Sequence, residues 1–142
     1  MPIAGVKPKM NKTVLDASAF LAYVGSEPGA QKVRAAIADG AVMSAINWAE
    51  VLTKLGERGI DLEHAAADFK ASGLIGGAIE LVPFVPGDAE MVALLREKTK
   101  TLGLSLADRA CLSLAMHLNA DVWTADRSWL GLKLTIQIKS IR

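Results

Sequence analysis

The sequence predicts an α/β domain built on a mainly parallel sheet, and three observations lead to this prediction. Short apolar segments that favour strands alternate with longer segments of helical periodicity. Crossovers of that length join parallel strands rather than the strands of a hairpin. The 142 residues are 51% hydrophobic and contain no repeat, low-complexity tract or linker. We therefore expect a single domain over residues 1–142, with residues 1–11 as a loose lead-in.

The first half of the chain is expected to contain two strands and four helices. Apolar side chains recur at helical spacing in the longer segments, and turns are marked by Pro28 with Gly29 and by Gly59. The predicted elements are a strand over 13–15, a helix over 17–24, a helix that ends near 39–40, a strand over 41–46, a helix over 47–58 and a helix that Asp61 caps and that ends around Gly73.

The second half continues the alternation of strands and helices. Pro83 indicates that the strand containing it ends there or lies at a sheet edge, and Gly103 is expected to end the next helix. The predicted elements are a strand over 79–84, a helix over 86–102, a helix over 105–118, a strand over 121–124 and a final strand over 134–138.

The overall composition restricts the classes of function. A net charge of +1 excludes a protein that holds nucleic acid by its global charge alone, but it allows a local basic surface. No apolar run is long enough to span a bilayer, and the first twelve residues lack the apolar core of a signal peptide. Because the single cysteine, Cys111, cannot form an internal disulfide, we expect a reducing cytoplasm as the compartment.

Four acidic residues occupy equivalent positions, each at the end of a predicted strand or in the first turn of a helix: Asp16, Glu50, Asp108 and Asp126. In a parallel sheet such positions share one edge. Two carboxylates about 5 Å apart repel by roughly 3 kcal/mol at an effective dielectric constant of about 20, so four together require a cation. Oxygen ligands without Cys or paired His favour Mg²⁺, with Mn²⁺ as a substitute. Such a centre suits phosphodiester hydrolysis.

Three of these acids also have purely structural explanations. Asp16 can cap the helix that follows it, and the spacing of Ser105 and Asp108 matches a capping box. Asp126 can stabilise a turn through its own backbone. Taken singly, none of them distinguishes a metal ligand from a cap.

Glu50 has the weakest placement of the four. It can form a capping box with Asn47 or an i,i+4 ion pair with Lys54 on a solvated helix face. On a helical wheel it lies roughly opposite the apolar stripe of its helix. It reaches a shared pocket only if the start of that helix crosses the carboxyl edge of the sheet.

Four strings of residues contain these acids, namely VLDASAF around Asp16, SAINWAEV around Glu50, LSLADRACLSLA around Asp108 and TADRSW around Asp126. With these strings in this order over nearly the whole chain, the sequence resembles a PIN domain, and specifically a VapC-type toxin of bacterial or archaeal toxin–antitoxin pairs.

The resemblance implies a three-layer α/β/α sandwich and a Mg²⁺-dependent endoribonuclease that hydrolyses RNA phosphodiester bonds. It maps the catalytic, metal-binding quartet onto the four acids named above. It further implies a homodimer and a cognate antitoxin protein whose tail blocks the acidic pocket. None of these assemblies is expected from composition or periodicity.

Other side chains are candidates for supporting roles. Ser18 and Thr124 are placed to orient a carboxylate or a metal-bound water. Basic residues that would contact phosphates are Arg96, Lys98, Lys100, Arg109 and Arg127, although the first three suit a solvated helix face and the last two could pair with the preceding acids. Among the tryptophans, Trp48 and Trp123 are expected in the core, and Trp129 is the candidate for base stacking.

Other classes of function are weighed against the toxin. An aspartyl-phosphate enzyme would require a second Asp where Ser18 stands or adjacent acids near the first strand, and neither is present. A PIN-like nuclease of RNA maturation or decay and a non-catalytic RNA- or protein-binding module remain as alternatives. The target RNA, the cleavage site and the number of metals are not encoded in any recognisable motif.

Overall fold

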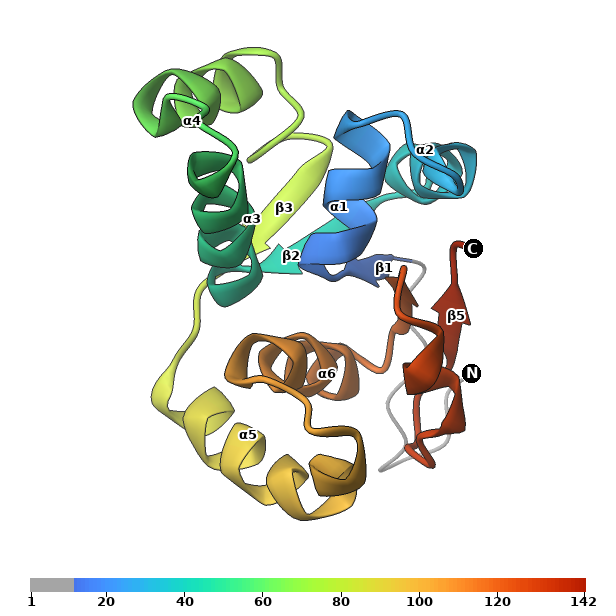
Figure 1. Cartoon of the computed structure of the whole chain (residues 1–142). Coiled ribbons are helices and arrows are strands. Elements are labelled where there is room, and N and C mark those ends of the chain that lie inside the picture. The colour runs from blue at the N-terminus through green and yellow to red at the C-terminus, as the bar shows by residue number, and fades with distance from the viewer. Residues whose placement is uncertain (1–11) are drawn as a thin grey trace, which may run out of the picture.

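The protein is built around a five-stranded parallel sheet with the strand order β3-β2-β1-β4-β5 (Figure 1). The computed structural model describes residues 12–142, so the expected lead-in at 1–11 lies outside the described residues. The strands are β1 (Thr13–Leu15), β2 (Ala41–Ser44), β3 (Ile79–Val82), β4 (Asp121–Thr124) and β5 (Ile138–Ser140). All four pairings are parallel, which confirms the predicted α/β class.

The central strand β1 separates two hydrophobic clusters because its side chains alternate between the faces of the sheet. Leu15 packs into the first cluster and Val14 into the second, and both are fully buried. The first cluster is covered by α1 (Ala17–Val24), α2 (Ala30–Ala38), α3 (Ala45–Glu57) and α4 (Leu62–Ala71). The second is covered by α5 (Pro86–Thr99) and α6 (Leu106–Leu118). The three-layer α/β/α sandwich is therefore confirmed (Figure 1).

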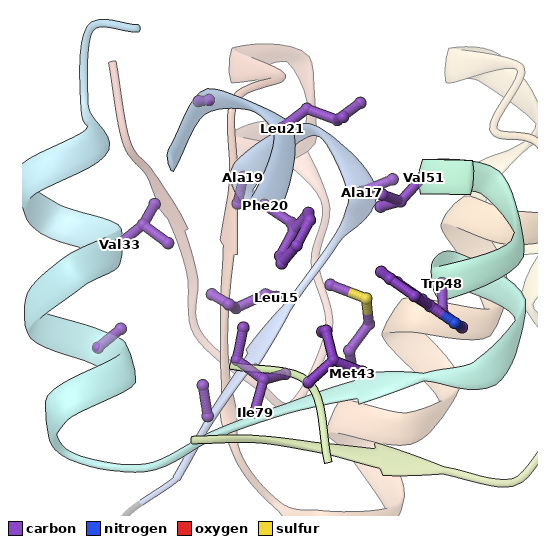
Figure 2. Packing of buried hydrophobic residues seen from close by; sticks show 14 of the residues in the cluster. Leu15, Ala17, Ala19, Phe20, Leu21, Val33, Met43, Trp48, Val51 and Ile79 are labelled. Atoms are coloured by element: carbon purple, nitrogen blue, oxygen red, sulfur yellow. The ribbon is translucent and has the colours of Figure 1, made fainter. Parts of the chain in front are cut away.

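An aromatic group fixes α3 and α4 to α1 in the first cluster. The ring of Phe20 meets those of Trp48 and Phe69 in edge-to-face contacts with centroid distances of 6.0 and 5.4 Å. Figure 2 shows Phe20 and Trp48 directed toward Leu15 and Met43 from the sheet. Because the start of α3 is held by this packing, the position of its first turn relative to β1 is well defined.

Most predicted elements are present, with ends that shift for identifiable reasons. The predicted strand over 41–46 stops at Ser44 because Ser44 caps α3 and its Oγ accepts a hydrogen bond from the Ile46 amide. The predicted helix over 86–102 is α5 followed by the 3-10 helix η1 (Lys100–Leu102), and Gly103 ends it in the left-handed conformation.

The prediction of a final strand over 134–138 was wrong in position. The observed strand β5 covers Ile138–Ser140, because pairing with β4 begins where Val122 lies opposite Ile138. Apolar and polar residues alternate around Ile136 because its side chain packs into the second cluster, although it lies outside a strand. A 3-10 helix, η2 (Arg127–Gly131), precedes this segment and was not predicted.

None of the helices within the described part of the chain is both long enough and apolar enough to cross a membrane.

Two glycines with similar backbone conformations allow the packing of the chain end to be tested. Gly29 has φ +94° and an added Cβ would lie 2.3 Å from the Ile141 carbonyl oxygen, whereas Gly59 has φ +82° and nothing within 4 Å. We expect Gly59→Ala to lower the free energy of unfolding by about 1 kcal/mol. Gly29→Ala should lower it by about 3 kcal/mol, because overpacking adds to the backbone strain. Urea unfolding measures both, and equal losses would contradict the close approach of Ile141.

Candidate active site

Asp16 is the first residue after β1 and the N-cap of α1. Its Oδ1 accepts a 2.8 Å hydrogen bond from the Ala19 amide, so the expected capping role is present. Its own amide donates to the Trp123 carbonyl on β4 at 3.3 Å. Asp16 is only 4% exposed, although caps are ordinarily solvated. Burial of this carboxylate therefore exceeds what capping requires.

Two hydroxyl groups hold the Asp16 carboxylate from different parts of the chain. The Ser18 hydroxyl lies 2.7 and 2.9 Å from the two carboxylate oxygens, and the Thr124 hydroxyl donates to Oδ2 at 2.6 Å. These hydroxyl oxygens in turn accept from backbone amides, Ser18 from Ala125 at 2.9 Å and Thr124 from Asp126 at 3.0 Å. The ends of β1 and β4 are thus joined through one carboxylate.

Burial raises the pKa of Asp16 from its ordinary 3.8 to about 6. The hydrogen bonds from Thr124, Ala19 and Ser18 lower the pKa and partly offset the effect of burial, whereas the negative charge of Asp108 raises it further. Burial and a neighbouring acid therefore both oppose the ionised form of this carboxylate, which a nearby positive charge would stabilise.

Asp108 lies in the first turn of α6, where it completes the expected capping box with Ser105. The Ser105 amide donates to Asp108 Oδ2 at 2.9 Å, and the Asp108 amide donates to the Ser105 hydroxyl oxygen at 3.1 Å. One turn later on the same helix, the buried thiol of Cys111 has a raised pKa. Burial is the main cause, followed by the charges of Asp16, Asp108 and Glu50. Three of the four acids therefore act electrostatically on one buried atom.

Glu50 is half-buried on α3 and forms the expected i,i+4 ion pair with Lys54, at 3.5 Å. The proposed capping box of Asn47 with Glu50 was wrong, because the N-cap of α3 is Ser44. Asn47 is instead fully buried, and its Nδ2 donates a 2.9 Å hydrogen bond to the Ala107 carbonyl on α6. The sequence did not predict this bond between α3 and α6, because an Asn within an apolar stretch does not identify its partner.

Asp126 is exposed at the start of η2, and it stabilises a turn as expected. Its Oδ1 accepts hydrogen bonds from the Ser128 amide at 2.9 Å and from the Ser128 hydroxyl at 2.7 Å. Asp126 is connected to Asp16 through Thr124, whose hydroxyl oxygen accepts from the Asp126 amide. Backbone and hydroxyl contacts thus join these two acids.

The four acids are not gathered into a ready-formed metal site. Among residues 12–142, no three His, Cys, Asp or Glu side chains are close enough to hold one ion together. The donor set nevertheless fits a hard divalent cation, since all the candidate ligands are carboxylate oxygens. Asp108 accepts its capping bond on Oδ2 and Asp126 its bonds on Oδ1, and in the described region the second oxygen of each accepts no hydrogen bond.

The candidate basic residues divide according to their partners. Arg109 does not pair with Asp108, because its guanidinium donates to the Val92 carbonyl on α5 at 2.8 Å. Lys100 forms a 2.7 Å ion pair with Glu97. Arg127 is exposed on η2, directly after Asp126, and Arg96 and Lys98 are exposed on α5.

The tryptophan predictions were partly wrong. Trp48 lies in the core as expected. Trp123 is half-buried and packs against the first cluster, so its core placement is borne out in part, and the Lys139 ammonium lies 5.5 Å from the centre of its ring. Trp129, the candidate for base stacking, is only 1% exposed because η2 packs it into the second cluster. A short 3-10 helix cannot be recognised from hydrophobic periodicity, so this burial had no sequence signal.

Comparisons with known proteins agree with this description. A family model described as "PIN domain" matches residues 13–132. The chain is similar in structure to DNA-bound VapBC from Salmonella typhimurium, with a TM-score of 0.68, 16% identity and coverage of 94% of this chain and 100% of that one. For VapBC-1 from nontypeable Haemophilus influenzae, the TM-score is 0.67, the identity 17% and the coverage 91% and 97%.

A third similar structure is VapC20 from Mycobacterium tuberculosis, described as a toxin that cleaves the sarcin–ricin loop. It has a TM-score of 0.66 and 14% identity, and the match covers 89% of this chain and 99% of that one. No curated protein matches the chain. At these identities the structural likeness shows the fold alone.

The burial of Asp16 generates a prediction about stability and pH. Because its pKa is higher in the folded protein, the metal-free protein binds more protons folded than unfolded between pH 4 and 6, and its stability falls as the pH rises through that range. Asp16→Asn keeps an oxygen for the Ala19 amide and removes the charge. It should raise the unfolding free energy at pH 7.5 by about 2–3 kcal/mol.

The exposed Asp126→Asn serves as its control and should change stability by less than about 0.5 kcal/mol. Both are measured by urea unfolding in EDTA at pH 4 and 7.5. If Asp16→Asn destabilised the protein at pH 7.5, capping by the charged form would be the dominant role of Asp16.

The hydroxyl contacts generate a second prediction. Thr124→Val removes the hydrogen bond that most strongly stabilises the charged form of Asp16, so its pKa should rise above 6. Thr99→Val is the control, because it removes a buried hydroxyl bond of similar kind, to the Leu95 carbonyl, far along the chain from the site. It should leave the pKa of Asp16 unchanged. Carboxyl ¹³C NMR titration of metal-free protein reports both. An unchanged Asp16 pKa in Thr124→Val would show that the 2.6 Å contact contributes little.

Proposed function

Because this chain belongs to the PIN domain family, we propose that it is a metal-dependent endoribonuclease that hydrolyses RNA phosphodiester bonds. The observation that carries this proposal is the buried Asp16 carboxylate at the carboxyl end of the central strand. Hydroxyl groups orient it, and the charge of Asp108 opposes its ionisation. Such a group gains most from a bound cation.

Mg²⁺ is the ion best suited to these ligands, and Mn²⁺ is a substitute. We propose that it is held by Asp16, Glu50, Asp108 and Asp126. When bound, the metal would polarise the phosphate, supply an activated water and stabilise the leaving oxygen.

The remaining residues would position these ligands and the substrate. Ser18 and Thr124 fix the orientation of the Asp16 carboxylate, because each bonds both to it and to a backbone amide after β4. Arg127 would contact a phosphate of the RNA, since it is exposed and adjacent in sequence to Asp126. Binding would then rest on a local basic contact, as the net charge of +1 requires.

We further propose that the protein is the toxin of a VapBC-type pair, with an antitoxin protein as partner and a homodimer as its assembled form. Support comes from the similar structures, which include VapBC complexes from Salmonella typhimurium and Haemophilus influenzae. A nuclease of RNA maturation or decay is the alternative within the same chemistry. A non-catalytic binding module is the alternative outside it.

The decisive experiment separates metal binding from capping. Asp108 and Asp88 are each the third residue of their helix, α6 and α5, and each side chain accepts a 2.9 Å hydrogen bond from the N-cap amide. Asp108→Asn should reduce RNA cleavage by about 100-fold or more, as expected for loss of a metal ligand. Asp88→Asn should lose comparable stability and retain cleavage. Asp16→Asn should be as inactive as Asp108→Asn.

Cleavage is measured on a panel of structured RNAs with Mg²⁺, with Mn²⁺ and with EDTA, which should abolish it. Equal activity of the Asp88→Asn and Asp108→Asn variants would assign Asp108 to capping. Wild-type protein without metal-dependent cleavage of any RNA would favour the non-catalytic module.

A further inference from the structure

Asn47 is a buried polar side chain whose amide has a hydrogen-bond partner for Nδ2 but none for Oδ1 among the described residues. It is 0% exposed and lies in the first turn of α3, three residues before Glu50. Its Nδ2 donates to the Ala107 carbonyl, which belongs to the residue preceding Asp108 on α6. This single bond therefore connects the first turns of the two helices that carry Glu50 and Asp108.

The orientation of the Asn47 amide is fixed by chemistry, because a carbonyl only accepts hydrogen bonds. Nδ2 must face the Ala107 oxygen, and Oδ1 is directed elsewhere. Oδ1 is fully buried and accepts no hydrogen bond within the described chain. A buried acceptor without a donor opposes folding, so fold stability alone does not explain an Asn here. Leu has a similar volume and would remove the unsatisfied group.

The Asn47–Ala107 bond lies close in the chain to both Glu50 and Asp108. Glu50 follows Asn47 by about one helical turn, and Asp108 follows Ala107 directly, so a shift of α6 along α3 changes the separation of the two carboxylates. The other described contacts of Asp108 are with its own turn, and the ion pair of Glu50 is with Lys54 on its own helix. Neither contact fixes one helix relative to the other.

We infer that Asn47 is a positioning residue of the metal centre, which holds the α6 turn of Asp108 at a fixed separation from the α3 turn of Glu50 through its bond to the Ala107 carbonyl. This inference rests on the proposed function, because it assigns Asn47 to the service of the metal ligands. Asn47 itself contacts neither metal nor RNA in this assignment.

The test compares Mn²⁺ affinity with stability in RNA-free protein. Asn47→Leu should weaken Mn²⁺ binding, measured by isothermal titration calorimetry, by about 10-fold or more, the usual effect of losing a residue that orients a ligand. Its unfolding midpoint in urea should be unchanged or higher. In cleavage assays kcat should fall while KM for RNA stays constant. Asn47→Ala removes the same donor without added bulk and should weaken Mn²⁺ binding equally.

Val51→Ala is the matched control, because Val51 is fully buried one turn further along α3 and packs into the first cluster. It should lose stability and bind Mn²⁺ like the wild type. Wild-type Mn²⁺ affinity in either folded Asn47 variant would overturn the inference while leaving the proposed function intact. Failure of both variants to fold would make Asn47 a determinant of the fold and also overturn it. A wild-type protein that binds no Mn²⁺ would remove the proposed function and this inference together.

Discussion

The structure depends on one unfavourable arrangement, a carboxylate buried at the end of the central strand. Asp16 is 4% exposed, and its burial is only partly compensated by hydroxyl and amide donors, so its pKa is raised to about 6. A domain of this size has only a small margin of stability. Keeping a buried acid here, rather than an Asn that would cap α1 equally well, is a sacrifice of stability that suits a site for a cation.

The surrounding structure fixes this carboxylate more firmly than the three other acids. The sheet supplies its backbone position, because β1 is paired on both sides and Leu15 and Val14 are buried in opposite clusters. Ser18 and Thr124 then set the orientation of the side chain from two strand ends. The carboxylates of Asp108 and Asp126 accept hydrogen bonds only from their own turns among the described residues. In the proposed centre, Asp16 would therefore be the most rigidly held ligand.

How much of this structure can be predicted from the sequence depends on how far apart in the chain the interacting residues lie. Strands and helices follow from local periodicity, so β1, α6 and the parallel sheet were predicted correctly. The burial of Trp129 depends on a 3-10 helix with no periodic signal, and β5 was misplaced because Ile136 packs like a strand residue without pairing as one. The Asn47–Ala107 bond spans 60 residues, and no local pattern predicts its partner.

The sequence left open whether the acids were caps or metal ligands, and the observed capping and turn bonds are compatible with both roles. Capping draws a carboxylate to the first turn of a helix, and in a parallel sheet these turns gather at one edge. Asp108 satisfies its cap with Oδ2 and Asp126 its turn with Oδ1, so each can keep its structural bond and still offer an oxygen to an ion. The local hydrogen bonds hold these carboxylates at the sheet edge in the absence of metal. In the proposed centre, capping would hold carboxylates of like charge in place before the cation binds.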